Sequence, residues 1–91
     1  MKLNRDIIPN HQLFYTASCP FCIMVRTTLF AKGLKMELKD IAFDPQNRQE
    51  LIIGGGKGQV PCLRIEKDDG TIVWMYESSD INNYIKNKLS N

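Results

Sequence analysis

Two cysteines, Cys19 and Cys22, follow closely on an uninterrupted apolar run within residues 12–16. Such a run suits a central strand that is buried on both faces. Ser18 is a candidate N-cap and Pro20 a candidate first-turn residue, so a helix should begin at the cysteine motif. The pattern therefore predicts that both thiols lie where a strand passes into a helix, which narrows the choice of fold more than any other feature of the chain.

The rest of the chain predicts the order β-α-β-α-β-β-α. The first helix should run to about residue 32, with Gly33 as its stop. A half-buried strand over 35–41 follows, and then a helix from Asp44 or Pro45 that ends at Gly54-Gly55-Gly56. The last elements are strands over 60–66 and 71–76 and a helix from about Ser78. A helical crossover makes the first two strands parallel, whereas the turn Asp68-Asp69-Gly70 makes the last two an antiparallel hairpin. We therefore predict an α/β fold with a mixed four-stranded sheet flanked by helices.

Ninety-one residues allow one compact domain, and we expect a lead-in over residues 1–11 and a single domain over residues 12–91. Twelve basic and 10 acidic residues give a net charge of +2, too small to indicate a nucleic acid or an anionic lipid surface as partner. No apolar run approaches the roughly 20 residues that span a bilayer, so no membrane contact is expected.

Charges at the N-terminus without an apolar segment behind them argue against a secretory signal and for a reducing compartment, the cytoplasm. A monomer is the default expectation.

The two thiols of Cys19-Pro20-Phe21-Cys22 should differ in reactivity. At a helix N-terminus, unpaired N–H groups and the helix dipole stabilise an anion. Thiols at such positions have pKa values of roughly 3.5–7.5. We therefore expect Cys19 to attack a disulfide, and the deeper Cys22, one turn later, to resolve the mixed disulfide that forms. Pro20 limits backbone freedom between the thiols, and Phe21 completes the active-site loop.

Zinc is the main alternative for this cysteine pair. A structural zinc site needs four ligands, usually supplied as two close pairs. Cys62 and His11 are the residues left to complete such a set, and they are not a close pair, so no metal site is expected. Two packed thiols without chemistry are a weaker alternative, because a proline stands between them at a helix start. Cys62 itself is expected to be a small buried apolar residue, with a redox side role as the second option.

The segment Gln59-Val60-Pro61 leads into the third strand. A proline in a sheet is confined to an edge, a bulge or a strand start. If the Val60–Pro61 bond is cis, the backbone N–H and C=O of Val60 point outward, where an extended peptide can pair with them. An ordinary trans proline at a strand start is the alternative, and composition alone favours it.

Glu77-Ser78-Ser79-Asp80 opens the last helix. Backbone N–H groups at a helix start can bind a carboxylate, so the segment is a candidate anion site. Plain capping by Ser78 or Ser79 is the alternative, and spacing alone favours it. Upstream, Lys57 lies in a glycine-rich loop that fails the phosphate-loop pattern, and we interpret this lysine as a contact for an anionic ligand.

With these three motifs in this order, the chain resembles the glutaredoxins, in particular those similar to the N-terminal, thioredoxin-fold domain of glutathione S-transferases. The resemblance covers about residues 12–90. It implies a thioredoxin-like fold whose first strand is central, and a cis Val60–Pro61 bond that faces the thiols. It also implies a glutathione site, in which Cys19 meets the glutathione sulfur and Val60 pairs with the cysteinyl backbone. Pro61 shapes that site, Glu77 and Ser78 hold the γ-glutamyl end, and Lys57 approaches a carboxylate.

The chain departs from the family pattern in three ways. Phe21 stands where tyrosine is common, which removes a hydroxyl but keeps an aromatic wall. Thr16 and Ser18 stand where many glutaredoxins have a lysine before the motif, which puts one usual glutathione contact in doubt. The helical second domain of the transferases is not expected in this chain, so conjugation of glutathione to foreign compounds is not expected either.

These observations predict a glutathione-dependent thiol–disulfide oxidoreductase. Glutathione would be its co-substrate, with no tightly bound cofactor, and its other partners would be disulfide-bonded or glutathionylated proteins. One alternative is a thioredoxin-like electron carrier that a flavoprotein reductase reduces. A second alternative is a glutaredoxin-like protein that binds zinc or an iron–sulfur cluster.

Overall fold

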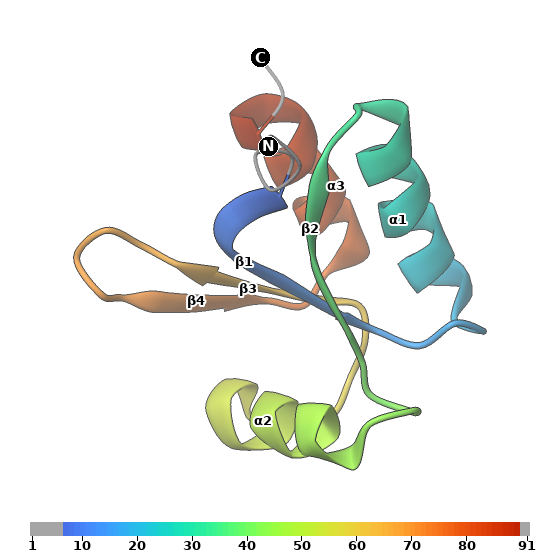
Figure 1. Ribbon diagram of the computed structural model, residues 1–91, viewed down its shortest axis with the longest axis vertical. Coiled ribbons are helices and arrows are strands. Elements are labelled where there is room, and N and C mark those ends of the chain that lie inside the picture. The colour runs from blue at the N-terminus through green and yellow to red at the C-terminus, as the bar shows by residue number, and fades with distance from the viewer. Residues whose placement is uncertain (1–6, 90–91) are drawn as a thin grey trace.

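The computed structural model describes residues 7–89 and is an α/β fold with one sheet between two layers of helix (Figure 1). The elements in order are β1 (Ile7–Tyr15), α1 (Pro20–Ala31), β2 (Lys35–Asp40), α2 (Pro45–Gly55), β3 (Cys62–Glu66), β4 (Ile72–Met75) and α3 (Ser78–Tyr84), which continues as a π-helical turn over Ile85–Leu89. The predicted order β-α-β-α-β-β-α is confirmed.

The four strands form one mixed sheet in the order β2-β1-β3-β4. β1 pairs in parallel with β2, and it pairs antiparallel with β3, which in turn pairs antiparallel with β4. Helices α1 and α3 cover one face of this sheet, whereas α2 lies alone against the other (Figure 1). The first strand is therefore inside the sheet, as the resemblance implies, and its carboxyl end points toward the cysteine motif.

The main core lies between the sheet and the α1/α3 layer. Leu13 of β1 and Leu63 of β3 are fully buried there against Val25 of α1 and Ile81 of α3, and Ile85 closes the cluster. Each side chain of this size stabilises the fold by about 1.5–3 kcal/mol when it leaves water. The cluster fixes the start of α1 and the start of α3 on the same face of the sheet.

A smaller core lies between the sheet and α2. Phe14 and Cys62 are fully buried there with Leu51 of α2, and Trp74 of β4 packs against them. The Phe14 and Trp74 rings lie 5.7 Å apart between centroids. Because strand side chains alternate between faces, Leu13 and Phe14 serve the two different cores, as the uninterrupted apolar run predicts.

The first strand begins earlier than the sequence predicts, at Ile7 instead of residue 12. The pairing of β1 with β2 shifts in register between Ile7 and Gln12, and Asn10 has a left-handed φ of 67° within that irregularity. A bulge accommodates both this conformation and Pro9, which otherwise reads as a strand breaker. Residues 1–6 of the predicted lead-in lie outside the described residues.

The glycine run after α2 differs from its prediction as a helix stop. Gly54 and Gly55 belong to the helix, and Gly56, with a φ of 94°, is the C-cap in the left-handed conformation. A Cβ on Gly54 would overlap the Trp74 ring, and one on Gly55 would overlap the Tyr76 hydroxyl. Two of the three glycines therefore allow the helix end to approach β4, and the third ends the helix.

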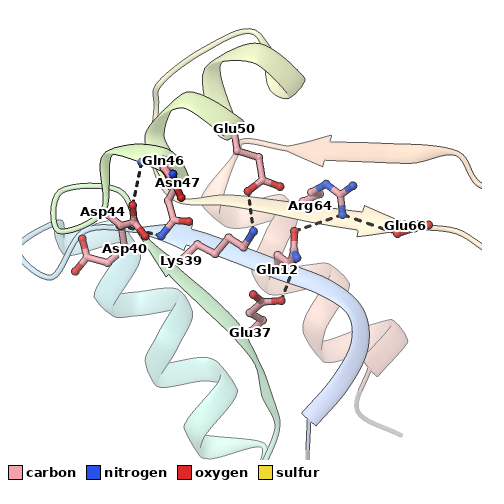
Figure 2. A network of polar contacts seen from close by, with 10 residues as sticks. All are labelled: Gln12, Glu37, Lys39, Asp40, Asp44, Gln46, Asn47, Glu50, Arg64 and Glu66. Atoms are coloured by element: carbon pink, nitrogen blue, oxygen red, sulfur yellow. Dashed lines mark hydrogen bonds and ion pairs between the residues drawn. The ribbon is translucent and has the colours of Figure 1, made fainter.

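Polar side chains occupy the face of the sheet beside α2 (Figure 2). Gln12 donates to Glu37 and accepts from Arg64, and Lys39 forms an ion pair of 2.7 Å with Glu50 of α2. Partly exposed pairs of this kind contribute at most about 1 kcal/mol each. In the part of the chain that the structure describes, no helix is both long and apolar enough to cross a membrane.

Candidate functional site

Cys19 is itself the N-cap of α1. Its sulfur accepts a hydrogen bond from the backbone N–H of Cys22 at 3.3 Å, and Pro20 fills the first helical turn. Ser18, the N-cap predicted from the sequence, is therefore one residue too early. A sulfur in this position takes the place of a capping oxygen, so that the free N–H groups of the helix end face the thiol.

Cys22 is fully buried, whereas Cys19 is only half-buried. Burial raises the pKa of the Cys22 thiol to about 12, and its hydrogen bond to the Cys19 sulfur contributes to the rise. Arg26, whose guanidinium lies 4.7 Å from the centroid of the Tyr15 ring, acts in the opposite direction on the pKa of Cys22. Cys22 is therefore a neutral thiol at physiological pH, and Cys19 is the member of the pair that solvent reaches.

The loop before β3 lies against the thiols. The Val60–Pro61 peptide bond is cis, as the resemblance implies. The Cys19 sulfur lies 3.9 Å from the carbonyl oxygen of Val60, to which the thiol donates a weak hydrogen bond. Residues about 40 positions apart in the chain are thus neighbours, because β1 and β3 are adjacent strands of the sheet.

A small cavity of about 190 Å³ opens beside this contact. We call it the cup, and its lining residues are Phe21, Gln59, Val60, Pro61, Tyr76, Glu77 and Ser78. Five of them are site residues predicted from the sequence. Cys19 reaches the cup through its contact with Val60, whereas Cys22 lies beneath it in the core. Larger grooves of about 610 and 590 Å³ lie elsewhere, along α1 and β2 and beside His11, and neither is lined by a cysteine.

The start of α3 carries no side-chain cap. Glu77 is the N-cap residue, and it makes no capping hydrogen bond with its side chain. Capping by Ser78 or Ser79, which spacing alone favours, is therefore not what the structure shows. Because Glu77 and Ser78 line the cup, the uncapped end of α3 and the cup share the same space.

Lys57 is not among the residues that line the cup. Its ammonium group lies 5.1 Å from the centroid of the Tyr76 ring, and its backbone is bonded to the Tyr76 hydroxyl. Gln59 and Tyr76 are cup residues that the sequence reasoning missed. Their place in the sequence could have indicated them, because Gln59 directly precedes Val60 and Tyr76 directly precedes Glu77.

Cys62 lies on the opposite side of Pro61 from Val60, in the smaller core. It is fully buried, and burial raises its pKa to about 12. It is thus a small buried residue, as predicted. Within residues 7–89, no group of three or more His, Cys, Asp or Glu side chains is placed to hold a metal ion.

Comparison with known families agrees with this geometry. The family described as glutathione S-transferase, N-terminal domain, matches residues 18–88, which is most of the chain. The chain belongs to this family. The match runs from the residue before Cys19 to the turn that follows α3, so this N-terminal-type domain contains the thiols, the cis-proline loop and the start of α3. No curated protein matches the chain.

Solved structures share the fold at low sequence identity. A thioredoxin-like protein is 19% identical with a TM-score of 0.66, covering 87% of this chain and 97% of its own. Maleylacetoacetate isomerase from Anaeromyxobacter dehalogenans, with glutathione bound in its active site, is 23% identical with a TM-score of 0.64 over 85% of this chain and 36% of its own. A glutaredoxin from Brucella melitensis is 20% identical with a TM-score of 0.57 over 88% of this chain and 83% of its own. The thioredoxin-like fold is thereby confirmed.

Proposed function

We propose that this protein is a glutathione-dependent thiol–disulfide oxidoreductase of the glutaredoxin type. The observation that carries the proposal is the placement of Cys19. Its sulfur caps α1, is partly open to solvent, and lies 3.9 Å from the Val60 carbonyl at the edge of the cup. The Cys19 thiol, the Val60 carbonyl and the start of α3, which has no side-chain cap, thus meet at the cup.

Glutathione fits this arrangement as co-substrate. It is an extended tripeptide with a central thiol and a carboxylate at each end. Its cysteinyl backbone would pair with Val60 beside Pro61, while its γ-glutamyl carboxylate would bind at Glu77 and Ser78, and Phe21 would form one wall. Lys57 supplies a positive charge near the other end. The Anaeromyxobacter isomerase, which shares the fold, carries glutathione in its active site and so supports the assignment.

The reaction is an exchange of disulfides. The Cys19 thiolate attacks the glutathione sulfur of a glutathionylated protein, the bond between that sulfur and the protein sulfur breaks, and the protein leaves as a thiolate that takes up a proton. A second glutathione thiolate then attacks the glutathione sulfur bonded to Cys19, which restores the Cys19 thiolate and forms glutathione disulfide. The second glutathione supplies the two electrons for the cycle.

Cys22 offers a second route, in which its sulfur displaces glutathione from Cys19 and closes a disulfide. That step requires Cys22 to lose its proton, and its burial and raised pKa disfavour this loss. We therefore infer that mixed disulfides are reduced through Cys19 alone, and that Cys22 acts when a protein disulfide must be resolved. The substrates would be disulfide-bonded or glutathionylated proteins of a reducing compartment such as the cytoplasm. The protein would act on them as a monomer.

The test is turnover of a glutathione mixed disulfide in the presence of glutathione and glutathione reductase. Wild type and Cys22→Ser should both be active, and Cys19→Ser should be inactive. If Cys19→Ser keeps its activity, the assignment of the nucleophile is wrong. If the wild type is inert with glutathione but accepts electrons from thioredoxin reductase, the protein is a thioredoxin-like carrier and the proposal is wrong.

A further inference from the structure

The loop between α2 and β3 carries the residues that would hold glutathione. It runs from Gly56 to Pro61 and includes Lys57, Gln59 and Val60. It contains two glycines, which leave the backbone unusually free to move. At its start, the Gly56 N–H bonds back to Ile52 O at 2.9 Å as the helix cap. The position of Val60 therefore depends on what holds the residues between the cap and Pro61.

The Tyr76 hydroxyl contacts this loop from the residue that follows β4. It donates to the carbonyl oxygen of Lys57 at 2.9 Å and accepts from the N–H of the same residue at 3.3 Å. One hydroxyl thus satisfies both backbone groups of one residue, in a loop that has a glycine on each side of that residue. The Tyr76 ring also lies under the Lys57 ammonium at 5.1 Å, so the side chain of that lysine is held as well.

The surroundings of Tyr76 fix both its position and its protonation. Gly55 of α2 packs so closely that any Cβ there would overlap the hydroxyl, so the helix end fits the tyrosine only because the residue is glycine. Burial raises the pKa of Tyr76 above its usual value, and the hydroxyl therefore stays protonated and able to donate across the physiological range. The phenol is consequently a fixed, neutral donor and acceptor.

We propose that Tyr76 is a positioning residue for glutathione, whose hydroxyl fixes the 56–61 loop so that Val60 at the cup, and Lys57 over the Tyr76 ring, are already in place. The inference rests on the proposed function. Tyr76 is itself a wall of the cup, so its ring remains useful in any variant. Without the hydroxyl, the loop must be ordered when glutathione binds, and that ordering opposes binding. The chemical step at Cys19 does not involve Tyr76.

The experiment compares Tyr76→Phe with Tyr84→Phe. Each change removes one hydroxyl and keeps the ring, but the Tyr84 hydroxyl bonds to His11 Nε2 at 2.8 Å, away from the cup. For Tyr76→Phe we expect the KM and the Kd for glutathione to rise about fivefold to tenfold, the loss of roughly one net hydrogen bond, with kcat within about twofold of wild type. Hydrogen exchange at the Lys57 amide should quicken about tenfold or more. Tyr84→Phe should change none of these values.

The outcomes separate the two proposals. If wild type does not bind glutathione in calorimetry, the proposed function fails, and the role of Tyr76 fails with it. If wild type binds and Tyr76→Phe binds equally well, the role of Tyr76 alone is refuted, whatever the exchange rate at Lys57. A fall in kcat without a change in KM would also refute it, because it would place Tyr76 in the chemical step. Urea unfolding of both variants checks that each is folded.

Discussion

Gly54 offers a sharp test of how α2 is seated, because two physical effects predict opposite signs. Alanine is the better helix former, and replacing a helical glycine by alanine stabilises a helix by about 0.8–1 kcal/mol. Yet a Cβ at Gly54 would overlap the Trp74 indole, with further ring atoms at 2.8 and 3.1 Å. The obstructing group is a rigid ring, which itself packs on Phe14, so it cannot simply turn aside.

The magnitude follows from comparing the two effects. Extra volume in a packed site destabilises a protein by about 1–3 kcal/mol. Subtracting the helix gain leaves Gly54→Ala less stable than wild type by about 1 kcal/mol, or roughly 4–8 °C in Tm for a domain of this size. In a Trp74→Leu background the ring is absent, so the same Gly54→Ala change should stabilise the protein by up to about 1 kcal/mol.

The assay is urea unfolding followed by far-ultraviolet circular dichroism, for wild type, both single variants and the double variant. Circular dichroism is required because Trp74 is the chain's one tryptophan, and fluorescence would be lost with it. Ile53→Ala, at a position 79% exposed in the same helix, is the control and should change the free energy of unfolding by no more than about 0.5 kcal/mol. If Gly54→Ala is more stable than wild type, the close approach of α2 to β4 is refuted.

Three further predictions concern charge and protonation. At about pH 8, iodoacetamide should modify Cys19 and spare Cys22 and Cys62, as peptide mapping by mass spectrometry will show, since burial raises the pKa of both of the latter to about 12. The folded-state pKa values of Cys22 and Cys62 exceed the values in the unfolded chain. The contribution of the two thiols to stability is therefore complete below about pH 8.5 and is lost as the pH rises toward 12. If urea unfolding shows constant stability across this window, the assignment is contradicted. Lys57→Ala should raise the Kd for glutathione about twofold to fivefold at low salt, and the difference should vanish at about 1 M salt, where exposed charges are screened.

Much of the fold follows from local patterns in the sequence. The uninterrupted apolar run of Leu13 and Phe14 predicts a strand buried on both faces, and the two residues do face two different cores. The crossover helix and the Asp68-Asp69-Gly70 turn predict the mixed sheet, in which Gly70 has the positive φ of 89° that the turn requires. These features depend on residues that are close together in the chain, so they can be predicted from a single sequence.

The misplaced features depend on contacts between distant residues. The early start of β1 at Ile7 rests on pairing with β2 through an irregular register, which no local pattern reports. Gly54 and Gly55 of α2 lie against Trp74 of β4 and against Tyr76, the residue after it, and this close approach joins residues about 20 positions apart. Ser18 is a conventional N-cap residue, but the Cys19 sulfur is the group that accepts the hydrogen bond from the Cys22 N–H.

The site shows the same division between local and distant information. Cys19, Val60, Glu77 and Ser78 each belong to a compact motif from which the sequence predicts a site, and the structure brings them together at the cup. Tyr76 is not among the site residues predicted from the sequence, because a tyrosine at the end of a predicted strand usually serves packing. Its hydroxyl bonds to Lys57, 19 positions away, and only the folded chain makes that pairing visible.

The central claim is that the Cys19 sulfur exchanges with glutathione held at the cup. The most direct measurement treats Cys22→Ser with glutathione disulfide, and then locates the adduct by peptide mapping before and after addition of free glutathione. We expect one glutathione per chain, attached to Cys19 and removed again by glutathione. A chain that takes up no glutathione, or carries it on Cys62 instead, would contradict the account.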